Sequence, residues 1–487
     1  MLTFSVCRSR LTRHLPRTWI CLRPYSSSPA DTDIHRIPPQ LNLEYYVQHT
    51  DALARNMQLR NYDSDSIYRV RDLYQQRQAL QSQTNSLVDA RDKVNAQIRQ
   101  SSTKEERQQH IVKAKEWKDQ IRQLEEQLVQ VDLSLTEQAL QIPNETHPNT
   151  PLGAEDQARI IKTVGSPRSS TGLLDHVAIA DKLDMIEFEQ AALVTGSKFY
   201  YLKNDGAWLE FALIQYAMHK AASRGFAPVL APDMVRTSIA YGCGFQPRKK
   251  EASQIYDVTT QSTVGTSAPK LCLVGTAEIP LAGLSAQKLY REEELPKRIV
   301  GFSHAFRAEA GHGSAEERGL YRVHQFSKVE LFTVTTPEQS ERMMEEMRAL
   351  QEDIFTELGL CFRVLDMPTE ELGASAYRKY DMEAWMPGKN GWGEISSTSN
   401  CTDYQTRRLD IRYLSKDFKD SVGSKDVRVP WHIKEKWVHH CHTLNGTAMA
   451  VPRVIIALLE THQRPDGTVD VPLPLRKWIP GEPSVLQ

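Results

Sequence analysis

The longest regular pattern in the chain is a heptad of apolar residues inside an otherwise polar segment. Residues 66–142 contain neither glycine nor proline and are rich in the helix formers Gln, Glu, Lys, Arg and Leu. Residues 101–106 interrupt the heptad, and Thr103 with Glu106 has the pattern of a capping box that opens a new helix. The apolar positions are Leu73, Leu80, Leu87 and Val94 before the interruption, and Ala114, Trp117, Ile121, Leu124, Leu128, Val131, Leu135 and Ile142 after it. This spacing predicts an antiparallel helical hairpin with a coiled-coil seam, each helix about 50–60 Å long at ~1.5 Å per residue.

Such a hairpin is too thin to enclose a globular core, so we expect it to project from the body as an arm. Its first half carries six Lys and Arg residues against three Asp, and its second half carries six basic against eight acidic residues. A modestly basic, exposed helix suits contact with nucleic-acid phosphates, and it also suits pairing with another helix. The heptads alone leave both roles open.

A second pattern, with period two, predicts a β-strand from Val323 to Val334. Its two faces differ, because the even positions place Phe326, Lys328 and Glu330 beside His324 and Phe332, whereas Val329 and Leu331 point the other way. Arg307 and Glu309 share a face of the preceding strand, and three glycines between the strands suit a hairpin turn. This polar face is either a ligand floor or a solvated strand face with charges two residues apart.

The remaining segments predict an α+β catalytic body. Pro143 ends the arm, and residues 143–175 are rich in Pro, Gly and Ser, as is typical of a connector. From His176 onward the composition is globular, with an amphipathic helix at 208–222 and then strands with few helices. Because hairpin-like connections dominate, we expect an antiparallel sheet. No GxGxxG or GxxxxGK[ST] phosphate loop is found, so any nucleotide binds by other means.

Composition bounds the function. The 487 residues suggest two or three domains, and 60 basic against 61 acidic residues leave a net charge of −1, so no global field attracts nucleic acid. Seven cysteines without CxxC pairs indicate neither a disulfide framework nor a zinc ribbon. The His439–His442 run is interpreted as structural rather than metal-binding, because alternate side chains of a strand diverge.

The first thirty residues form a separate segment. They contain five arginines and several serines, and the first acidic residue is Asp31. This composition is typical of an organelle transit peptide, and it lacks the apolar centre of a secretory signal. No apolar run is long enough to span a membrane. We expect a mitochondrial matrix protein with no membrane segment, the alternative being a disordered basic tail.

Three further stretches carry candidate chemistry. Thr276 and Glu278 offer a hydroxyl and a carboxylate two residues apart, on one face of an extended segment, which suits an ammonium ligand. Glu394 to Ser397 offers oxygen ligands suited to Mg²⁺. Arg453 stands at the start of an apolar helix, where the helix dipole assists phosphate binding. Each residue alone has a structural alternative as a surface or paired charge.

Together these stretches resemble the class II aminoacyl-tRNA synthetases. Phe306 to Glu309 with the Phe326–Glu330 strand resembles motif 2, the stretch that ends at Pro232 resembles motif 1, and Thr447 to Arg453 resembles motif 3. The stretches 276–278, 319–326 and 399–405 are similar to those of seryl-tRNA synthetases, whose N-terminal hairpin the arm also resembles. With the leader, the chain looks like the mitochondrial form. The resemblance implies a transit peptide at 1–25, a tRNA-binding domain at 26–145, a linker at 146–175 and a class II catalytic domain at 176–487.

The resemblance also implies roles for individual residues. L-Serine and tRNA(Ser) would be the substrates, ATP and Mg²⁺ the cofactors, and a second copy of the chain the partner in a homodimer formed through motif 1. Arg307 and Arg453 would be catalytic. ATP would contact Arg307, Ala308, Glu309, Val323, Phe326, Glu394, Ile395, Ser396, Ser397 and Arg453. Serine would contact Thr276, Ala277, Glu278, Arg307, Glu330 and Thr447. The metal ligands would be Glu394 and Ser397.

Two positions depart from the family pattern, and two rival functions are weighed against a serine–tRNA ligase. Thr447 stands where serine is common, which keeps the hydroxyl, and Pro452 stands where glycine is common. A catalytically silent paralogue that binds RNA would lack phosphate or serine ligands, yet Arg307, Glu330 and Arg453 are present. An enzyme that loads serine onto a carrier protein would have little use for the arm.

Overall fold

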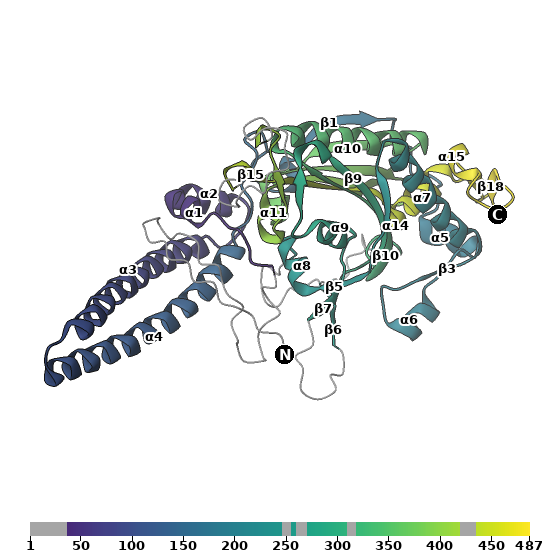
Figure 1. Cartoon of the computed structure of the whole chain (residues 1–487). Helices are drawn as coiled ribbons and strands as arrows, with labels where there is room; N and C mark the ends of the chain where they lie inside the picture. Colours follow the sequence, from purple (N-terminus) through teal and green to yellow (C-terminus); the bar gives the residue numbers. More distant parts are fainter. Residues whose placement is uncertain (1–36, 246–254, 260–269, 309–317, 419–434) are drawn as a thin grey trace, which may run out of the picture.

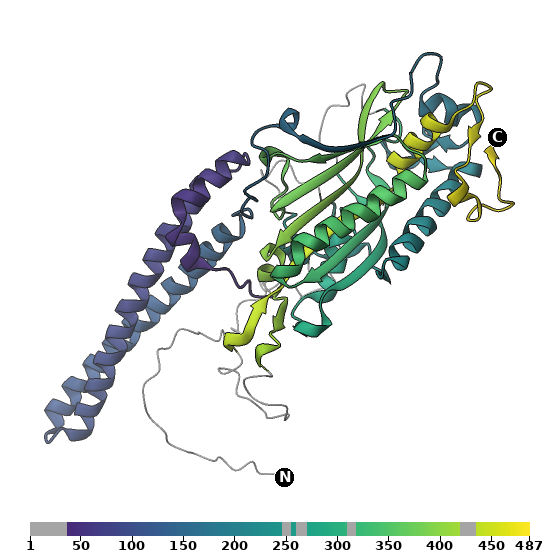
Figure 2. The ribbon, with the colours of Figure 1, turned by 90° about the horizontal axis from the view of Figure 1, so that it is seen from above.

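The protein, described here from a computed structural model, consists of a helical arm and a sheet-based body (Figure 1). The structure describes residues 37–245, 255–259, 270–308, 318–418 and 435–487. The arm elements are α1 Leu43–Gln48, α2 Thr50–Leu59, α3 Asp65–Gln100 and α4 Lys104–Leu140. Helices α3 and α4 run antiparallel and project from the body, as the heptads predict (Figures 1 and 2). The predicted α+β architecture is therefore confirmed.

The arm is held together by the predicted seam. The buried residues of α4 are Ile121, Leu128, Val131, Leu135 and Ala139, at spacings of seven, three, four and four. Thr103 caps α4, because its hydroxyl accepts a hydrogen bond from the Glu106 N–H at 3.3 Å. Arg77 on α3 and Asp132 on α4 form an ion pair at 2.6 Å, which places these two positions side by side.

The body is organised around one eight-stranded sheet. Its strands, in spatial order, are β1 Arg159–Val164, β11 Phe362–Asp366, β12 Arg378–Met386, β13 Gly391–Thr402, β16 His442–Ala450, β10 Gln325–Thr335, β9 Lys297–Phe306 and β4 Ala227–Leu230. All neighbours are antiparallel except β4, which pairs parallel with β9 at one edge. Strand β1 forms the other edge, so the segment 146–175, predicted as a linker, also supplies part of the sheet.

Helices cover both faces of the sheet. The long helices are α7 Asn204–Ser223, α10 Pro337–Glu357 and α14 Val451–His462; shorter ones are α5 His176–Lys182, α6 Glu189–Thr195, α8 Thr237–Gly242, α9 Glu278–Ser285, α11 Tyr404–Leu409 and α15 Leu473–Arg476. The long helices bury one face, where Val329 and Leu331 of β10 lie in the main core. Helices α8, α9 and α11 cover the other face, where Phe332 and Val334 lie in a second core. The alternation along β10 is the predicted one.

Small strands complete the body. They are β2 Ile186–Glu187, β3 Tyr201–Leu202, β5 Met234–Arg236, β6 Asp257–Val258, β7 Leu271–Leu273, β8 Leu289–Arg291, β14 Arg412–Leu414, β15 Val438–His440, β17 Val469–Asp470 and β18 Val485–Leu486. In the part of the chain that the structure describes, no helix combines the length and the apolar character needed to cross a membrane.

The arm joins the body through a buried polar joint. Asn144, just after α4, donates from Nδ2 to the carbonyls of Ser375 and Cys401, each at 2.9 Å. Arg408 on α11 donates to the carbonyl of Ile142 at 3.1 Å, and so satisfies a carbonyl just beyond the end of α4. These bonds fix the base of the arm on the body.

Candidate active site

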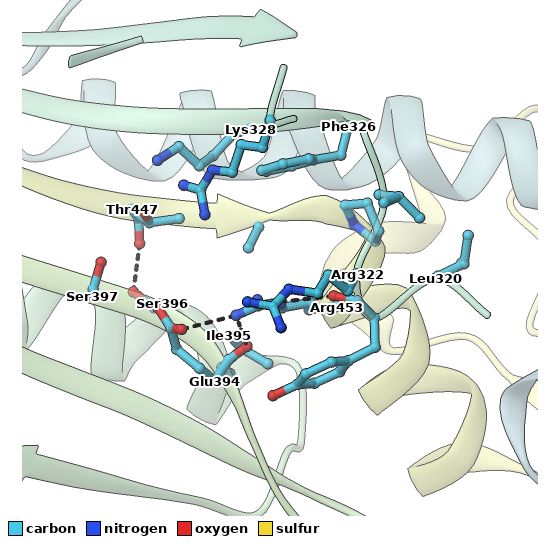
Figure 3. A pocket seen from close by; sticks show the side chains of 15 residues that line it. Leu320, Arg322, Phe326, Lys328, Glu394, Ile395, Ser396, Ser397, Thr447 and Arg453 are labelled. Atoms are coloured by element: carbon cyan, nitrogen blue, oxygen red, sulfur yellow. Dashed lines mark hydrogen bonds and ion pairs between the residues drawn. The ribbon is translucent and has the colours of Figure 1, made fainter. Parts of the chain in front are cut away.

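A cleft lies over the central strands of the sheet (Figure 3). Strand β16 runs between β10 and β13, and motif residues from all three strands line the cleft. The predicted site residues among the lining are Arg307, Val323, Phe326, Glu394, Ile395, Ser396, Ser397, Thr447 and Arg453. Residues that are up to 146 positions apart in sequence are therefore brought together as the motifs predict.

Arg453 and Glu394 form an ion pair at one end of this cleft. Arg453 Nη1 donates to Glu394 Oε2 at 2.9 Å and to its carbonyl at 3.0 Å, and the guanidinium lies 4.7 Å from the ring centre of Tyr321. Desolvation in the cleft raises the pKa of Glu394, but Arg453, followed by Lys379, outweighs it and lowers the pKa to about 2. The Glu394 carboxylate is therefore ionised at neutral pH.

A β-bulge allows Glu394 and Ser397 to line the same cleft. Residues three apart on a regular strand point to opposite faces. In β13, however, Ser396 pairs with Met382 while Glu394 pairs with Glu383, so Ile395 is an extra residue in the ladder. The register also shifts in β16, where Thr447 pairs with Glu330.

The donors around Glu394 fit a hard divalent cation. Glu394 supplies an ionised carboxylate and Ser397 a hydroxyl, which are oxygen ligands of the kind that Mg²⁺ takes. On the neighbouring strand Asp381 pairs with Ser397, is 5% exposed, and keeps its Oδ1 without a hydrogen-bond partner. No group of three or more His, Cys, Asp or Glu side chains in the described ranges is arranged to hold a metal ion, the His439–His442 run included. Mg²⁺ needs only one or two protein ligands when oxygens of the substrate phosphates complete its coordination shell.

A second cluster of charges lies beneath the cleft and comes from β10, β16 and α9. Glu330 Oε2 accepts hydrogen bonds from Lys328 Nζ at 2.8 Å and from Thr447 Oγ1 at 3.1 Å. The Glu278 carboxylate is 5% exposed, and burial, with a further contribution from Glu330, raises its pKa to about 8. This pair of acidic residues can surround an ammonium group.

The local structure at Thr276 and Glu278 differs from the prediction. The sequence predicts both on one face of an extended segment, but Thr276 and Ala277 form a turn and Glu278 is the first residue of α9. The turn still brings them together, because Thr276 Oγ1 accepts a hydrogen bond from the Glu278 N–H at 3.3 Å. Thr276, Ala277 and Glu278 are all buried, and none of them is among the residues that line the cleft.

Arg307 follows the last residue of β9 and reaches across to β10. Its guanidinium carbon is 5.3 Å from the ring centre of Phe326, and Nε donates to the carbonyl of Gly275 at 3.4 Å. The Arg307 N–H donates to the carbonyl of His324 at 2.8 Å, which extends the pairing of the two strands by one step. Ala308 is half-buried beside it, and Glu309 lies outside the described residues.

Comparison with known proteins gives the same assignment over most of the chain. Residues 41–146 match the seryl-tRNA synthetase N-terminal domain, and residues 265–462 match the tRNA synthetase class II core domain (G, H, P, S and T). The serine–tRNA ligase of Treponema denticola is 41% identical over 89% of this chain and 97% of its own length. The mitochondrial serine–tRNA ligase of Schizosaccharomyces pombe is 40% identical, over 90% and 88% respectively. The chain belongs to the seryl-tRNA synthetase family.

Solved structures of the family have the same fold. The crystal structure of the seryl-tRNA synthetase from Pyrococcus horikoshii complexed with ATP superposes with a TM-score of 0.80 at 30% identity, covering 92% of this chain and 99% of that one. The cytoplasmic serine–tRNA ligase from Naegleria fowleri in complex with AMP gives a TM-score of 0.76 at 28% identity, covering 92% and 98%. The likeness thus includes the arm as well as the body.

Among the residues of this seryl-tRNA synthetase site that were not assigned a role from the sequence, three have specific contacts to predicted site residues. Lys328 pairs with Glu330, Tyr321 lies under Arg453, and Gln405 bonds Glu278. Lys328 was on the predicted polar face, and the other two lie within stretches that carry the family resemblance. Their sequence signal marked them as part of the site, but their partners became visible only in the folded chain.

The departure at Pro452 is accommodated at the helix start. Helix α14 begins at Val451, so Pro452 is its second residue, and Pro lacks an N–H where none is needed for the helix. Arg453, the next residue, still reaches Glu394 and Tyr321. The departure at Thr447 keeps a hydroxyl on Glu330.

Proposed function

We propose that this protein activates L-serine with ATP and transfers the seryl group to the 3′ end of tRNA(Ser). The observation that carries this proposal is the arrangement of charges along β10. Phe326, at one end, lies with Arg307 and Arg453 on the cleft, while Glu330 lies with Glu278 beneath its other end. Residues 326 and 330 are about 13 Å apart at ~3.3 Å per residue, a span that suits an adenine at one end and an amino acid at the other.

At the nucleotide end we assign Phe326 to stack on adenine and Arg453 to bind the terminal phosphate. Arg307 would hold the α-phosphate, and Val323, Ile395 and Ser396 would line the remaining nucleotide surface, with Ala308 and Glu309 beside them. Arginine suits this task because its planar guanidinium presents several donors at fixed angles. The guanidinium of Arg453 is already placed by hydrogen bonds to main-chain carbonyls, which supports a preorganised phosphate site.

At the amino-acid end we assign Glu278 and Thr276 to the ammonium group of serine, beside Ala277. Glu330 and Thr447 would receive its hydroxyl. A site built to hydrogen-bond a hydroxyl rejects alanine by about 10⁴-fold, because its buried polar groups would lose their partner. Threonine keeps the hydroxyl and must be excluded by volume, which discriminates by only about 10–200-fold.

The chemistry requires no side-chain nucleophile. The serine carboxylate attacks the α-phosphorus and pyrophosphate leaves. The terminal hydroxyl of the tRNA then attacks the carbonyl carbon of the seryl-adenylate, the bond to the phosphate breaks, and AMP and the hydroxyl proton are released. Arg307 would neutralise charge that develops on the α-phosphate in the transition state. Glu394 and Ser397 would hold Mg²⁺, which, when bound, neutralises phosphate charge and orients the leaving pyrophosphate. The remaining acceleration comes from holding the two reactants in line.

Two assembly properties belong to the same proposal. The arm would bind tRNA, since it places nine Lys and Arg residues between positions 78 and 131, remote from the cleft.

A homodimer would cover apolar side chains that the single chain leaves exposed along α6, α7 and β4: Leu193 is 79% exposed, Val194 64%, Trp208 45%, Phe211 54% and Leu230 86%. In sedimentation experiments we expect the unsubstituted protein to be a dimer and the Leu230→Asp variant to be a monomer. A monomeric unsubstituted protein would rule this surface out as the dimer contact.

We place this activity in the mitochondrial matrix. The support is the Arg-rich, acid-poor segment before Asp31, which lies outside the described residues. A fusion of residues 1–36 to a fluorescent protein should be imported and shortened by a protease. A fusion that stays in the cytosol at full length would refute the localisation, and the processing point would show whether cleavage lies near position 25.

The test of function is serine-dependent ATP–pyrophosphate exchange by the chain from Ser26 onward, with alanine and threonine as controls. We expect exchange with serine, at least 10³-fold less with alanine, and charging once tRNA(Ser) is added. Exchange without subsequent charging would leave amino-acid activation and refute the tRNA acceptor. Absence of exchange from a folded protein would refute the proposed function.

A further inference from the structure

One buried amide in the amino-acid site has contacts that go beyond packing. Gln405 on α11 is 0% exposed, and its Nε2 donates to Glu278 Oε1 at 2.6 Å. The same nitrogen lies 3.4 Å from the carbonyl of Cys243, and Gln405 Oε1 accepts from Thr443 Oγ1 at 2.7 Å. One side chain thus links the Glu278 carboxylate to Cys243, the residue after α8, and to β16.

The orientation of this amide follows from the chemistry of its neighbours. A main-chain carbonyl such as that of Cys243 only accepts hydrogen bonds, and the Glu278 carboxyl keeps acceptor capacity whether or not it carries a proton. Both lie on the same side of the amide, so the NH₂ group must face them. The Thr443 hydroxyl on the opposite side can donate, which suits the amide oxygen. The flipped amide would set its oxygen against the carbonyl of Cys243, which cannot donate.

The Gln405 amide is an uncharged hydrogen-bond donor among the titratable groups that surround Glu278. The charged or titratable side chains that act on Glu278 are Glu330, Lys328, Arg307, Cys243 and Cys401. Glu330 opposes ionisation of Glu278, whereas Lys328 and Arg307 favour it. The hydrogen bond from Gln405 also favours the ionised form, because it stabilises the charged carboxylate.

Resting on the proposed function, we propose that Gln405, oriented by Thr443, is a positioning residue of the amino-acid site that holds the Glu278 carboxylate in place to bind the ammonium group of serine. A neutral amide suits this task better than a charged residue. Lysine at position 405 would satisfy Glu278 and compete with the substrate ammonium, and glutamate would add a third carboxylate beside two others. The amide fixes the carboxylate and leaves its charge for the substrate.

The test compares Gln405→Met, Gln405→Glu and Thr443→Val in the full chain, with Gln463→Met as the matched control. Gln463 is also a buried glutamine with hydrogen bonds from both ends of its amide, but its partners are Leu174 and Glu460, outside the site. Serine and ATP dependence of pyrophosphate exchange is measured at pH 6.5, 7.5 and 8.5, together with thermal unfolding of each variant.

For Gln405→Met we expect the KM for serine to rise about 10- to 100-fold at pH 7.5, as for loss of a hydrogen bond to a charged group, with the KM for ATP unchanged. The deficit should shrink toward pH 8.5, because loss of the donor raises the pKa of Glu278 and a higher pH restores its charge. Thr443→Val should show a smaller change of the same kind, and Gln405→Glu a larger loss. Gln463→Met should alter unfolding alone.

A purely structural role for Gln405 predicts a different result. In that case Gln405→Met would lower the unfolding temperature, as Gln463→Met does, and its serine KM and pH profile would equal those of the unsubstituted protein. That result would overturn the inference, as would equal and pH-independent rises in the serine and ATP KM values. If the unsubstituted protein itself shows no serine-dependent exchange, the proposed function fails first, so the two failures are distinguishable.

Discussion

The ion pair between Lys328 and Glu330 offers the sharpest test of how this site is built. The two charges are 2.8 Å apart, and their side chains are 8% and 1% exposed. Lys328→Met keeps the length and the apolar stem of the lysine but removes its ammonium. Glu330 then keeps one hydrogen bond, from the Thr447 hydroxyl at 3.1 Å, and faces Glu278 without a compensating cation on its own strand.

The magnitude follows from the burial. Removing one partner of a buried ion pair costs about 3–5 kcal/mol, because the remaining charge stays desolvated and unpaired. At about 1.5 °C per kcal/mol for a domain of roughly 310 residues, the unfolding temperature should fall by about 5–8 °C. Replacing both charges by neutral groups of similar size is often nearly neutral, so Lys328→Met with Glu330→Gln should recover most of the loss.

The assay is a double-mutant cycle on the unsubstituted protein, the two single variants and the double variant. Urea and thermal unfolding give the stability of each, and serine-dependent pyrophosphate exchange gives its activity. We expect a coupling of about 3 kcal/mol in stability, whereas activity stays lost in both proteins that carry Glu330→Gln. Single variants that lose less than about 1 kcal/mol, or a double variant as unstable as the sum of the singles, would refute the assignment of a buried, structurally coupled pair.

Three further predictions concern other parts of the molecule. Arg307→Ala should reduce pyrophosphate exchange by about 10²–10³-fold with little change in unfolding, since it removes charge stabilisation of the transition state; near-normal exchange would refute the motif 2 assignment. Residues 78–131 can be replaced by a short glycine turn, because the Arg77–Asp132 ion pair holds the flanking positions of α3 and α4 side by side. This change shortens the arm by about 35 Å and spares its base, so it should leave exchange within about twofold and abolish tRNA charging. Glu278→Gln should gain about 2 kcal/mol of stability relative to the unsubstituted protein between pH 6 and 8.5. The pKa of Glu278 is raised from 4.5 to about 8, so the unsubstituted protein loses stability as the pH rises toward 8, whereas the variant does not. Parallel pH profiles of the two proteins would contradict the burial of this charge.

The parts of the fold that show a regular hydrophobic period could be predicted from the sequence. The heptads of the arm and the alternation along β10 survive in the structure because each pattern divides buried from exposed positions over many residues. The joint between arm and body could not be read in this way. Its bonds join Asn144 and Arg408 to carbonyls that are distant in sequence, and main-chain carbonyls carry no sequence signal. Strand β1 was missed for a related reason, since a short edge strand with mostly exposed residues resembles a polar connector.

The site was predicted as a set of residues but not as a geometry. Resemblance named Glu394 and Ser397, yet only the pairing with β12 shows the extra residue, Ile395, that lets both line the cleft. Likewise the sequence named Thr276 and Glu278 but suggested an extended segment, because two residues cannot distinguish a strand from the turn that precedes a helix. Bulges and turns of this kind depend on the neighbouring strand, which one stretch of sequence does not contain.

The charges beneath the cleft explain how an amino-acid site can be buried and still be selective. Glu278 and Glu330 are two acids in a dry environment, and Lys328 balances one of them. Burial and Glu330 raise the pKa of Glu278 to about 8, so in the empty site at neutral pH the second acid is balanced mostly by a proton. A substrate ammonium can take the place of that proton and leave the buried group neutral overall. A ligand without an ammonium would leave Glu278 protonated and its hydrogen bonds unmatched, so the same burial that destabilises the empty site favours an α-amino acid over other carboxylates.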